Sequence, residues 1–459
     1  MTQPNLRTES LFKLTWPIFV QNTTHSLVVI VDFLFFSYLS DETAGTVGQL
    51  LPIIWMGAFV IPVFAGTGVS VASQYMGSRQ FEKVVPAYMM NLLFTLVLAW
   101  SFAGGLWFFS SDIGRWMGMD ESLNAIATVY LGTMSGYFVF MGVLVSYNAV
   151  ISSRGMTHWL MYSAVMIGTI NLALDSLFVF VFHLGVRGIV LASLIAAAAA
   201  MALAMLLVHR NLGVRFYLRG AVRDMFGVLR PMMRIGLPNI IEPLSYTLQQ
   251  TVISTMIIAM GVTSMAANSY AGRAQMFQIT FAVALALSVQ ILIAHWMGAR
   301  RFDDVNRLFW RALRVAMIVA AAYSAVLWLA SDLVLGVFTD EPAIKQLGKS
   351  LLFISLFLEP ARTVNIIGGF ALRTAGDARF PLVVGIIFIW GILPVIFLIQ
   401  RFWGIGLVGL WICFAGDEII RAGINAWRWR TRRWESMGIA HFKLRPAETL
   451  VASKLPGEP

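Results

Sequence analysis

Four polar side chains have the chemistry of a site that binds a proton or a small cation. Asp32 and Asp175 are carboxylates, while Asn171 supplies an amide and Ser193 a hydroxyl. Because Asn171 and Asp175 are i and i+4, a helix would place both on one face. Two adjacent carboxylates repel each other when both are ionised, so binding a proton or a cation relieves them. The alternative interpretation is structural, since polar side chains of these types also join buried helices by hydrogen bonds.

A second set of polar side chains, of mixed charge, lies later in the chain. Glu359 and Arg362 are i and i+3, and this spacing favours a local ion pair on one helix. A pair between Glu242 and Arg362 across two helices is an alternative that stays open. With Gln250 and Arg273, these residues are candidates to line a second cavity.

Motifs of other function classes are present only in part. Gly404-Ile-Gly406-Leu-Val-Gly409 has the spacing of a dinucleotide-binding loop but follows no predicted strand, and Gly348-Lys349-Ser350 lacks the first glycine of a phosphate-binding loop. The six histidines show no metal-ligand spacing, and the single cysteine excludes an internal disulfide. We therefore expect no enzyme, no resident metal or cofactor, no bound nucleotide and no nucleic-acid partner.

Long apolar segments must position these residues. Of the 459 residues, 58% are hydrophobic and only 12% are charged, against about 25% charged in soluble domains. A segment of about 20 apolar residues crosses a hydrocarbon core about 30 Å thick. We predict twelve spans, near residues 12–39, 46–75, 84–108, 123–151, 157–182, 186–208, 235–260, 267–297, 305–330, 345–372, 380–400 and 404–427.

The spans bring the first set of polar residues to similar depths. Counted from the same side at a rise of about 1.5 Å per residue, Asp32 lies about 20 residues into the first span and Asp175 about 18 residues into the fifth. Ser193 follows the start of the sixth span by about two helical turns, counted from the other side. If the N-terminus is cytoplasmic, these residues therefore fall in the outer half of the bilayer. Ionisable residues are costly there, so each is a candidate functional residue.

The basic residues predict the orientation of the chain. With a cytoplasmic N-terminus, 26 of the 33 Lys and Arg residues fall in inner segments and five in outer segments. The inner count includes Arg421, assigned to the C-terminal tail. Cytoplasmic loops usually carry the excess of basic residues, so we expect both termini in the cytoplasm.

The two halves of the sequence repeat with a constant offset. Pro17 matches Pro238, and Gly77 matches Gly298, with the same separation in both pairs. An even number of spans in each half makes both halves enter the membrane from the same side, related by a pseudo-two-fold axis along the membrane normal. The predicted fold is an all-α membrane protein of two parallel six-helix repeats. Its parts are an N-lobe (1–209), a basic cytoplasmic linker (210–234), a C-lobe (235–430) and a cytoplasmic tail (431–459).

A series of short motifs, taken in their order along the sequence, resembles the multidrug and toxic compound extrusion (MATE) family along essentially the whole chain. The combination with a 6+6 repeat is what makes the resemblance specific. It rests on Trp16-Pro17 with Asp32 in the first span, Gln74-Tyr-Met-Gly77, Asn171-x-x-x-Asp175, Gly185-Val-Arg-Gly188, and Leu372-Arg373-Thr-Ala-Gly376-Asp377 before Pro381.

The resemblance implies a V-shaped antiporter that exports amphipathic, often cationic small molecules in exchange for inward H⁺ or Na⁺. The first set of polar residues falls where such proteins carry the cation site of the N-lobe. Arg362 stands where the sodium-coupled branch has an acidic residue, and Leu358 stands where it has a tyrosine. We therefore expect H⁺ as the coupling ion, with Na⁺ at Asp32, Asn171 and Asp175 as the alternative.

Other functions remain as alternatives. The first is a flippase of lipids or lipid-linked oligosaccharides from the same superfamily, although such proteins tend to have a strongly basic cavity and this chain places only two arginines clearly within spans. A channel and a membrane-bound acyltransferase are alternatives from other classes. We expect a multi-pass protein of the plasma membrane, in bacteria the inner membrane, which acts as a monomer among membrane lipids on a small-molecule substrate.

Overall fold

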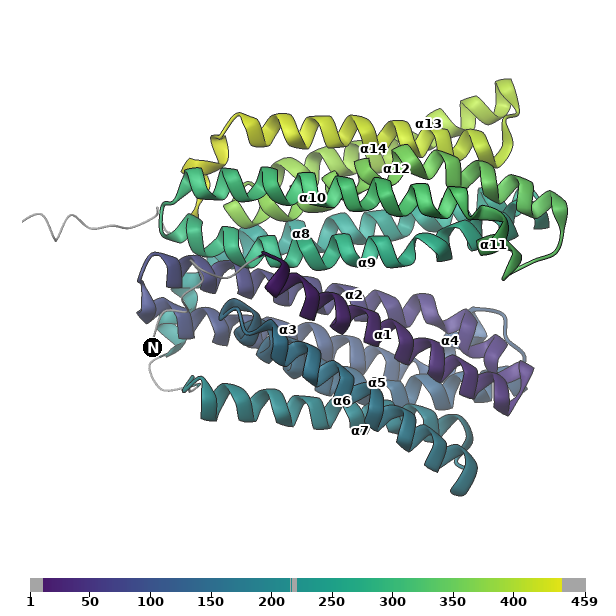
Figure 1. Ribbon diagram of the computed structural model, residues 1–459. Helices are drawn as coiled ribbons and strands as arrows, with labels where there is room; N and C mark the ends of the chain where they lie inside the picture. Colours follow the sequence, from purple (N-terminus) through teal and green to yellow (C-terminus); the bar gives the residue numbers. More distant parts are fainter. Residues whose placement is uncertain (1–10, 215, 217–220, 440–459) are drawn as a thin grey trace, which may run out of the picture.

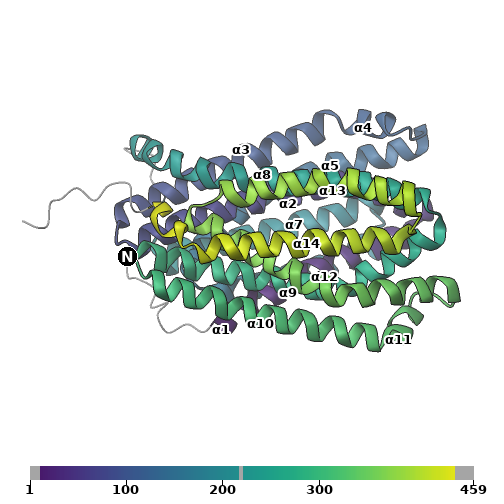
Figure 2. The same ribbon diagram turned by 90° about the horizontal axis from the view of Figure 1, so that it is seen from above.

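The computed structural model describes residues 11–214, 216 and 221–439, with the backbone alone at 221–225. These residues form fourteen α-helices and contain no strand. Twelve of the helices correspond to the predicted spans, and the short helices α4 and α11 precede α5 and α12. Figure 1 shows two lobes, α1–α7 and α8–α14, and in Figure 2 the long helices run roughly parallel.

The helices of the N-lobe end in several irregular turns. Helices α6 and α7 each continue into one π-helical turn, η2 and η3. The N-lobe helices are α1 (Leu11–Leu39), α2 (Asp41–Gly77), η1 (Phe81–Lys83), α3 (Val84–Phe108), α4 (Ser110–Trp116), α5 (Glu121–Ser153), α6 (Thr157–Ser176), η2 (Leu177–Val181), α7 (Gly185–Leu206) and η3 (Leu207–Asn211).

The C-lobe repeats this order of elements. Its helices are α8 (Ala221–Ala259), α9 (Val262–Gly298), α10 (Phe302–Leu329), α11 (Ser331–Gly336), α12 (Pro342–Ala375), α13 (Arg379–Trp403) and α14 (Gly406–Arg430), followed by the 3₁₀ turn η4 (Arg433–Met437).

The constant offset of the sequence repeat holds in the backbone. Helices α2 and α9 begin, and also end, at positions related by this offset. Arg79 and Arg300, another such pair, both have a left-handed backbone, with φ of 59° and 57°. Gly77 and Gly298 contact the partner helix at the same end of the molecule, where an added Cβ would lie 2.0 Å from the carbonyl oxygens of His295 and Gln74, respectively. The two repeats are therefore parallel, as predicted.

The composition of the helices is that of a membrane protein. Ten of the described helices are long and apolar enough to cross a membrane. The other two long helices, α8 and α14, are more polar because they carry charged residues within the C-lobe, including Glu242 on α8 and Asp417 and Arg421 on α14. Together they make the twelve-span fold.

Two boundaries differ from the prediction. Helix α8 begins at Ala221, so much of the predicted linker is helical, and Val228 and Met232 are buried against the N-lobe. Arg421 lies within α14 beside two carboxylates, so counting it with the tail was wrong. Among the other basic residues counted for orientation, Arg7, Arg215, Arg219, Lys443, Arg445 and Lys454 lie outside the described residues, as do parts of the predicted linker and tail.

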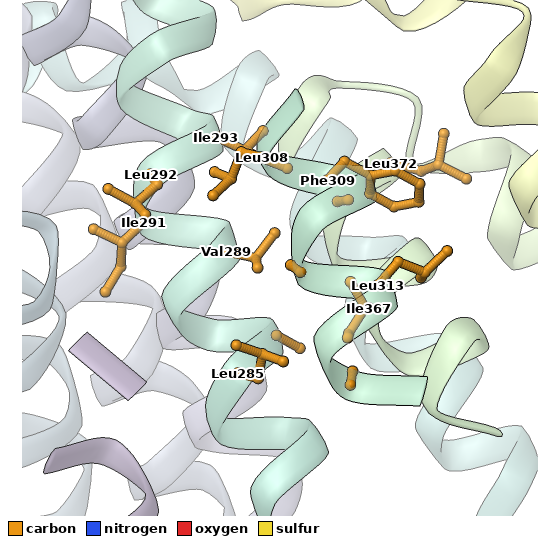
Figure 3. Packing of buried hydrophobic residues seen from close by; sticks show 14 of the residues in the cluster. Leu285, Val289, Ile291, Leu292, Ile293, Leu308, Phe309, Leu313, Ile367 and Leu372 are labelled. Carbon is orange, nitrogen blue, oxygen red and sulfur yellow. The ribbon is translucent and has the colours of Figure 1, made fainter. Parts of the chain in front are cut away.

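Each lobe is held by apolar packing between its helices. In the C-lobe, Leu285 and Val289 of α9 meet Phe309 and Leu313 of α10 and Ile367 of α12 (Figure 3). Small residues let the helices approach closely, as is typical of helix contacts in membranes. Many large apolar side chains point outward instead, which suits helices that face lipid.

Candidate functional site

The four residues of the first predicted set converge in the N-lobe. Asp32 comes from α1, Asn171 and Asp175 from α6, and Ser193 from α7. The hydroxyl Oγ of Ser193 donates to Asp32 Oδ2 at 3.0 Å. We call these four residues the N-lobe cluster. Residues from three helices, up to 161 positions apart in the sequence, are thus in hydrogen-bond contact.

The Asn171 amide sits between the two carboxylates. With its nitrogen turned toward them, it donates to Asp32 Oδ1 at 2.9 Å and to Asp175 Oδ2 at 3.2 Å. Its oxygen lies 3.0 Å from Ser193 Oγ, so it and Asp32 Oδ2 share the single hydroxyl proton of Ser193 as acceptors. This orientation gives both ends of the amide suitable partners, whereas the opposite one directs its oxygen at the carboxylates. One amide nitrogen therefore holds both acids in place.

The members of the N-lobe cluster differ in burial. Asp175 is fully buried and Asn171 is 1% exposed, whereas Asp32 and Ser193 are partly exposed. The π-helical turn η2 follows Asp175 almost at once, and such turns are frequent at functional sites. On α5, Tyr130 and Tyr137 lie near Asp32. Asp32 is thus the more exposed of the two acids.

The N-lobe cluster has the chemistry to hold one proton or one monovalent cation. Asp175 Oδ1 is buried and has no protein partner among the described residues. Two carboxylates around one amide repel each other when both are ionised, and a shared proton or a bound cation removes the repulsion. In the described chain, no group of three or more His, Cys, Asp or Glu residues is arranged to hold a metal ion.

A second cluster of charge lies inside the C-lobe. Arg362 of α12 is paired with Glu359 on the same helix, with 2.5 Å between Nη1 and Oε1, which confirms the predicted local pair. Its Nε lies 3.8 Å from Glu418 Oε1 on α14. Glu359 is fully buried, while the Arg362 side chain is 23% exposed. Arg362 is therefore the more exposed member of this pair.

Helix α14 extends this cluster. Arg421 binds Asp417 Oδ2 at 2.5 Å and Glu418 Oε1 at 2.9 Å. The amide of Asn365 on α12 donates to Glu418 Oε2 at 2.6 Å, which ties the two helices together. We call Glu359, Arg362, Asp417, Glu418 and Arg421 the C-lobe cluster; it holds three acids and two bases.

The remaining candidates of the second set lie apart from one another. Glu242 pairs with Arg373, not with Arg362, and the Nη1–Oε2 distance is 2.5 Å. The alternative pair across two helices is therefore not formed. Gln250 lies one helical turn after Tyr246 on α8, and Tyr246 lies near Arg362 and Glu418. Arg273 is exposed on α9 and forms no ion pair with another described residue.

Sequence reasoning missed the part of the C-lobe cluster on α14. The signal was present, because Asp417, Glu418 and Arg421 have the i, i+3 and i, i+4 spacing of a charged helix face. Because Arg421 was assigned to the tail, the predicted helix lacked the base that balances Asp417 and Glu418. Asn365, which links α14 to α12, carried no signal of its own.

Comparisons with known proteins identify the family. The family model MatE matches residues 17–177 and again 238–397, and the starts of the two matches have the offset of the sequence repeat. The chain is 30% identical over 449 residues to the uncharacterized transporter YisQ of Bacillus subtilis (strain 168), covering 96% of this chain and 98% of that protein. It is 20% identical to the probable multidrug resistance protein NorM of Thermotoga maritima, with 95% of each chain covered.

A solved structure agrees with the fold. The Vibrio cholerae MATE transporter VcmN, in its bent form, superposes with a TM-score of 0.86 at 20% sequence identity, covering 93% of this chain and 97% of that one. At 20% sequence identity, this structural similarity shows that the two proteins share a fold. Taken with the two matches of the family model, it shows that the chain belongs to the MatE family of multidrug and toxic compound transporters.

Proposed function

We propose that this protein is a secondary antiporter that exports amphipathic, cationic small molecules in exchange for inward H⁺, with the N-lobe cluster as the coupling site. The observation that carries the proposal is the meeting of Asp32 and Asp175 at the single amide nitrogen of Asn171. Membership of a family of multidrug transporters supports the substrate class.

In this proposal, proton and substrate compete through charge. With Asp32 ionised, the cluster attracts a cationic substrate toward its partly exposed side. A proton that binds from outside cancels this charge, so the protonated state holds the substrate less tightly and releases it. A ligand shifts a conformational equilibrium only by its differential affinity for the two states. The gain or loss of one charge in a medium of low dielectric constant supplies such a difference.

Sodium ion is the alternative coupling ion. The oxygens of Asp32, Asn171 and Asp175 are donors that suit a hard monovalent cation, and they lie on neighbouring helices. The charge argument is the same, because Na⁺ also cancels one carboxylate charge. We favour H⁺ because the two acids share the amide of Asn171, and the buried Asp175 Oδ1, which has no partner among the described residues, can take up one proton.

The test is substrate flux in proteoliposomes under a pH gradient and a Na⁺ gradient imposed separately. We expect export to follow the pH gradient, to persist without Na⁺, and to stop when an ionophore collapses the pH gradient. Flux that survives this collapse and stops only on removal of Na⁺ would assign Na⁺ as the coupling ion. Loss of flux under every gradient, with translocation of a labelled lipid instead, would favour the flippase alternative.

We further propose that the protein lies in the plasma membrane with both termini in the cytoplasm and works as a monomer. In this orientation, the ends of α2 and α9 that meet at Gly77 and Gly298 face the cytoplasm. The excess of basic residues on that side supports this orientation.

A further inference from the structure

The segment after α14 connects the two lobes. Beyond Arg430 the chain turns at Arg432, forms η4, and continues through Gly438 to Ile439. We call residues 433–439 the strap. In Figure 1 it follows α14 at the left-hand end of the molecule and turns from the C-lobe toward the N-lobe.

The strap is anchored in the C-lobe by aromatic packing. Trp434 is fully buried and stacks on Trp429, with ring centroids 4.4 Å apart, and Trp429 in turn stacks on Phe309 at 4.1 Å. The indole nitrogen of Trp434 donates to the carbonyl oxygen of Trp429 at 2.9 Å. Arg432, just before the strap, pairs with Asp303 at 2.5 Å. Stacked aromatic pairs add to the large apolar area that each ring buries, so this anchor is strong.

Among the described residues of the strap, Ile439 at its other end contacts the N-lobe. Ile439 is 5% exposed and packs into the apolar core of the N-lobe. Its backbone N–H donates to Gln74 Oε1 of α2 at 2.8 Å. The same Gln74 side chain donates from Nε2 to the carbonyl oxygen of Thr374 on α12 at 2.5 Å. Gln74, which is fully buried, thus ties α2 to both α12 and the strap.

Close backbone contacts lie beside this junction. An added Cβ on Gly376 would lie 2.1 Å from the carbonyl oxygen of Met437, so the strap passes directly over the end of α12. The amide of Gln290 on α9 donates to Ser70 Oγ at 2.8 Å and to the carbonyl oxygen of Gly66 at 2.9 Å. Hydrogen bonds between the lobes therefore gather at this end.

We propose that the strap is a latch that holds this end of the transporter closed, and that its release from Gln74 is a step in opening. The proposal rests on the proposed function in one respect, that a transporter must open both ends in turn. If α2 and α9 part here, the strap cannot keep both anchors. The C-lobe anchor directly follows α14 and includes the buried Trp434. Within residues 433–439, the N-lobe anchor consists of the Ile439 side chain and its one backbone hydrogen bond. The strap therefore leaves the N-lobe and stays with the C-lobe.

The test uses a buried cysteine as a reporter of opening. In a Cys413→Ser background, Ser70→Cys places a thiol at the closed junction, where Ser70 is 1% exposed. Ile439→Ala removes most of the apolar anchor, and Ile439→Pro removes the N–H donor. Proline is compatible with the preceding backbone, because Gly438 has φ −58° and ψ 144°. We expect either change to raise the rate of maleimide labelling at position 70 by about fivefold or more, as for a lost hydrogen bond or a truncated core side chain.

A second reporter separates opening from unfolding. Ser324→Cys reports from α10, where Ser324 is fully buried and far in sequence from the strap, so its labelling should stay slow in both variants. Equal labelling at position 70 in the parent and in both Ile439 variants would overturn the latch. Faster labelling at both reporters would also overturn it, because the strap would then support the whole fold. Neither readout needs substrate or an ion gradient, so a failure of proton coupling would leave this test unaffected.

Discussion

At the scale of residues, the two carboxylates of the N-lobe cluster have different positions around one amide. Asp175 is fully buried on α6, whereas Asp32 on α1 is partly exposed, and both accept from Asn171. A buried acid with restricted access suits a structural or proton-sharing role. A partly exposed acid can exchange its ion with the surroundings. We therefore propose that Asp32 carries the exchange step and that Asp175 supports it.

Replacing Asp32 by Asn should abolish coupled export. A neutral amide does not cycle between a charged and a protonated form, so we expect flux driven by a pH gradient to fall by about a hundredfold or more, as when an essential ionisable group is removed. Asp175→Asn should reduce flux severely. Asp41→Asn, an exposed acid at the start of α2, is the matched control and should retain normal flux. Normal flux in Asp32→Asn vesicles would show that coupling lies elsewhere.

In the C-lobe cluster, removing one charge of an ion pair should lower stability more than removing both charges. Arg362→Met leaves Glu359 buried and without its base, which costs about 3–5 kcal/mol of stability for a broken buried pair. The double variant Glu359→Gln with Arg362→Met should recover much of this loss. Thermal unfolding in detergent measures both effects. A double variant that is no more stable than Arg362→Met would show that the pair is not the source of the loss.

The sequence predicted one cluster well and the other only in part. Asn171 and Asp175 share a helix face by spacing, and Asp32 reaches their depth by counting residues, so the N-lobe cluster could be inferred. The contacts of Arg362 with α14 and of Glu242 with Arg373 depend on how helices pack side by side. Depth along a span says nothing about which face of a helix meets which neighbour, and for this reason the pairing of Glu242 was not predicted.

At the scale of elements, the crossing of α2 and α9 depends on two glycines. Gly77 and Gly298 each lie against the backbone of the other helix, where a methyl group would come within 2.0 Å of a carbonyl oxygen. Contact this close is typical of small residues between membrane helices. The crossing closes the end of the molecule that the strap also covers, so both features act on the same opening.

Substituting these glycines should force the crossing apart. Gly298→Ala must displace the backbone of α2, which we expect to cost about 1–3 kcal/mol, the usual range for overpacking a close contact. Gly105→Ala on α3 is the control, because no atom lies within 4 Å of its added Cβ, and it should not lower stability, since alanine is the better helix former. Thermal unfolding of both variants in detergent compares them directly. Equal unfolding temperatures would mean that the crossing relaxes without cost.

Hydropathy predicted the spans but not the beginning of α8. The residues before position 235 include Arg230 and Arg234, so a count of apolar residues begins the span after them. The helix continues backward to Ala221 because Val228 and Met232 bury an apolar face on the N-lobe. This apolar face results from packing between the two lobes, so the mean hydropathy of a sequence window does not reveal it.

At the scale of the whole molecule, two parallel repeats fix which residues share a side of the membrane. The turn between α9 and α10 at Arg300 and its counterpart at Arg79 lie at one end, and the loop between α11 and α12 at Asp340 lies at the other. Neither the family nor the repeat determines which end is cytoplasmic. We propose the orientation from the distribution of basic residues, because arginines and lysines are retained on the cytoplasmic side during insertion.

The orientation can be tested with two exposed positions in the Cys413→Ser background. Arg300→Cys and Asp340→Cys each replace an exposed residue at an opposite end of the fold. We expect a membrane-impermeant maleimide to label position 340 in intact cells, and to label position 300 only after the membrane is permeabilised. The opposite pattern would place the termini outside. It would also reverse the direction of the proposed exchange, because the end closed by Gly77, Gly298 and the strap would then face the exterior. Labelling at 340 alone in intact cells makes that closed end cytoplasmic, so the partly exposed side of the N-lobe cluster would be reached from outside in this state.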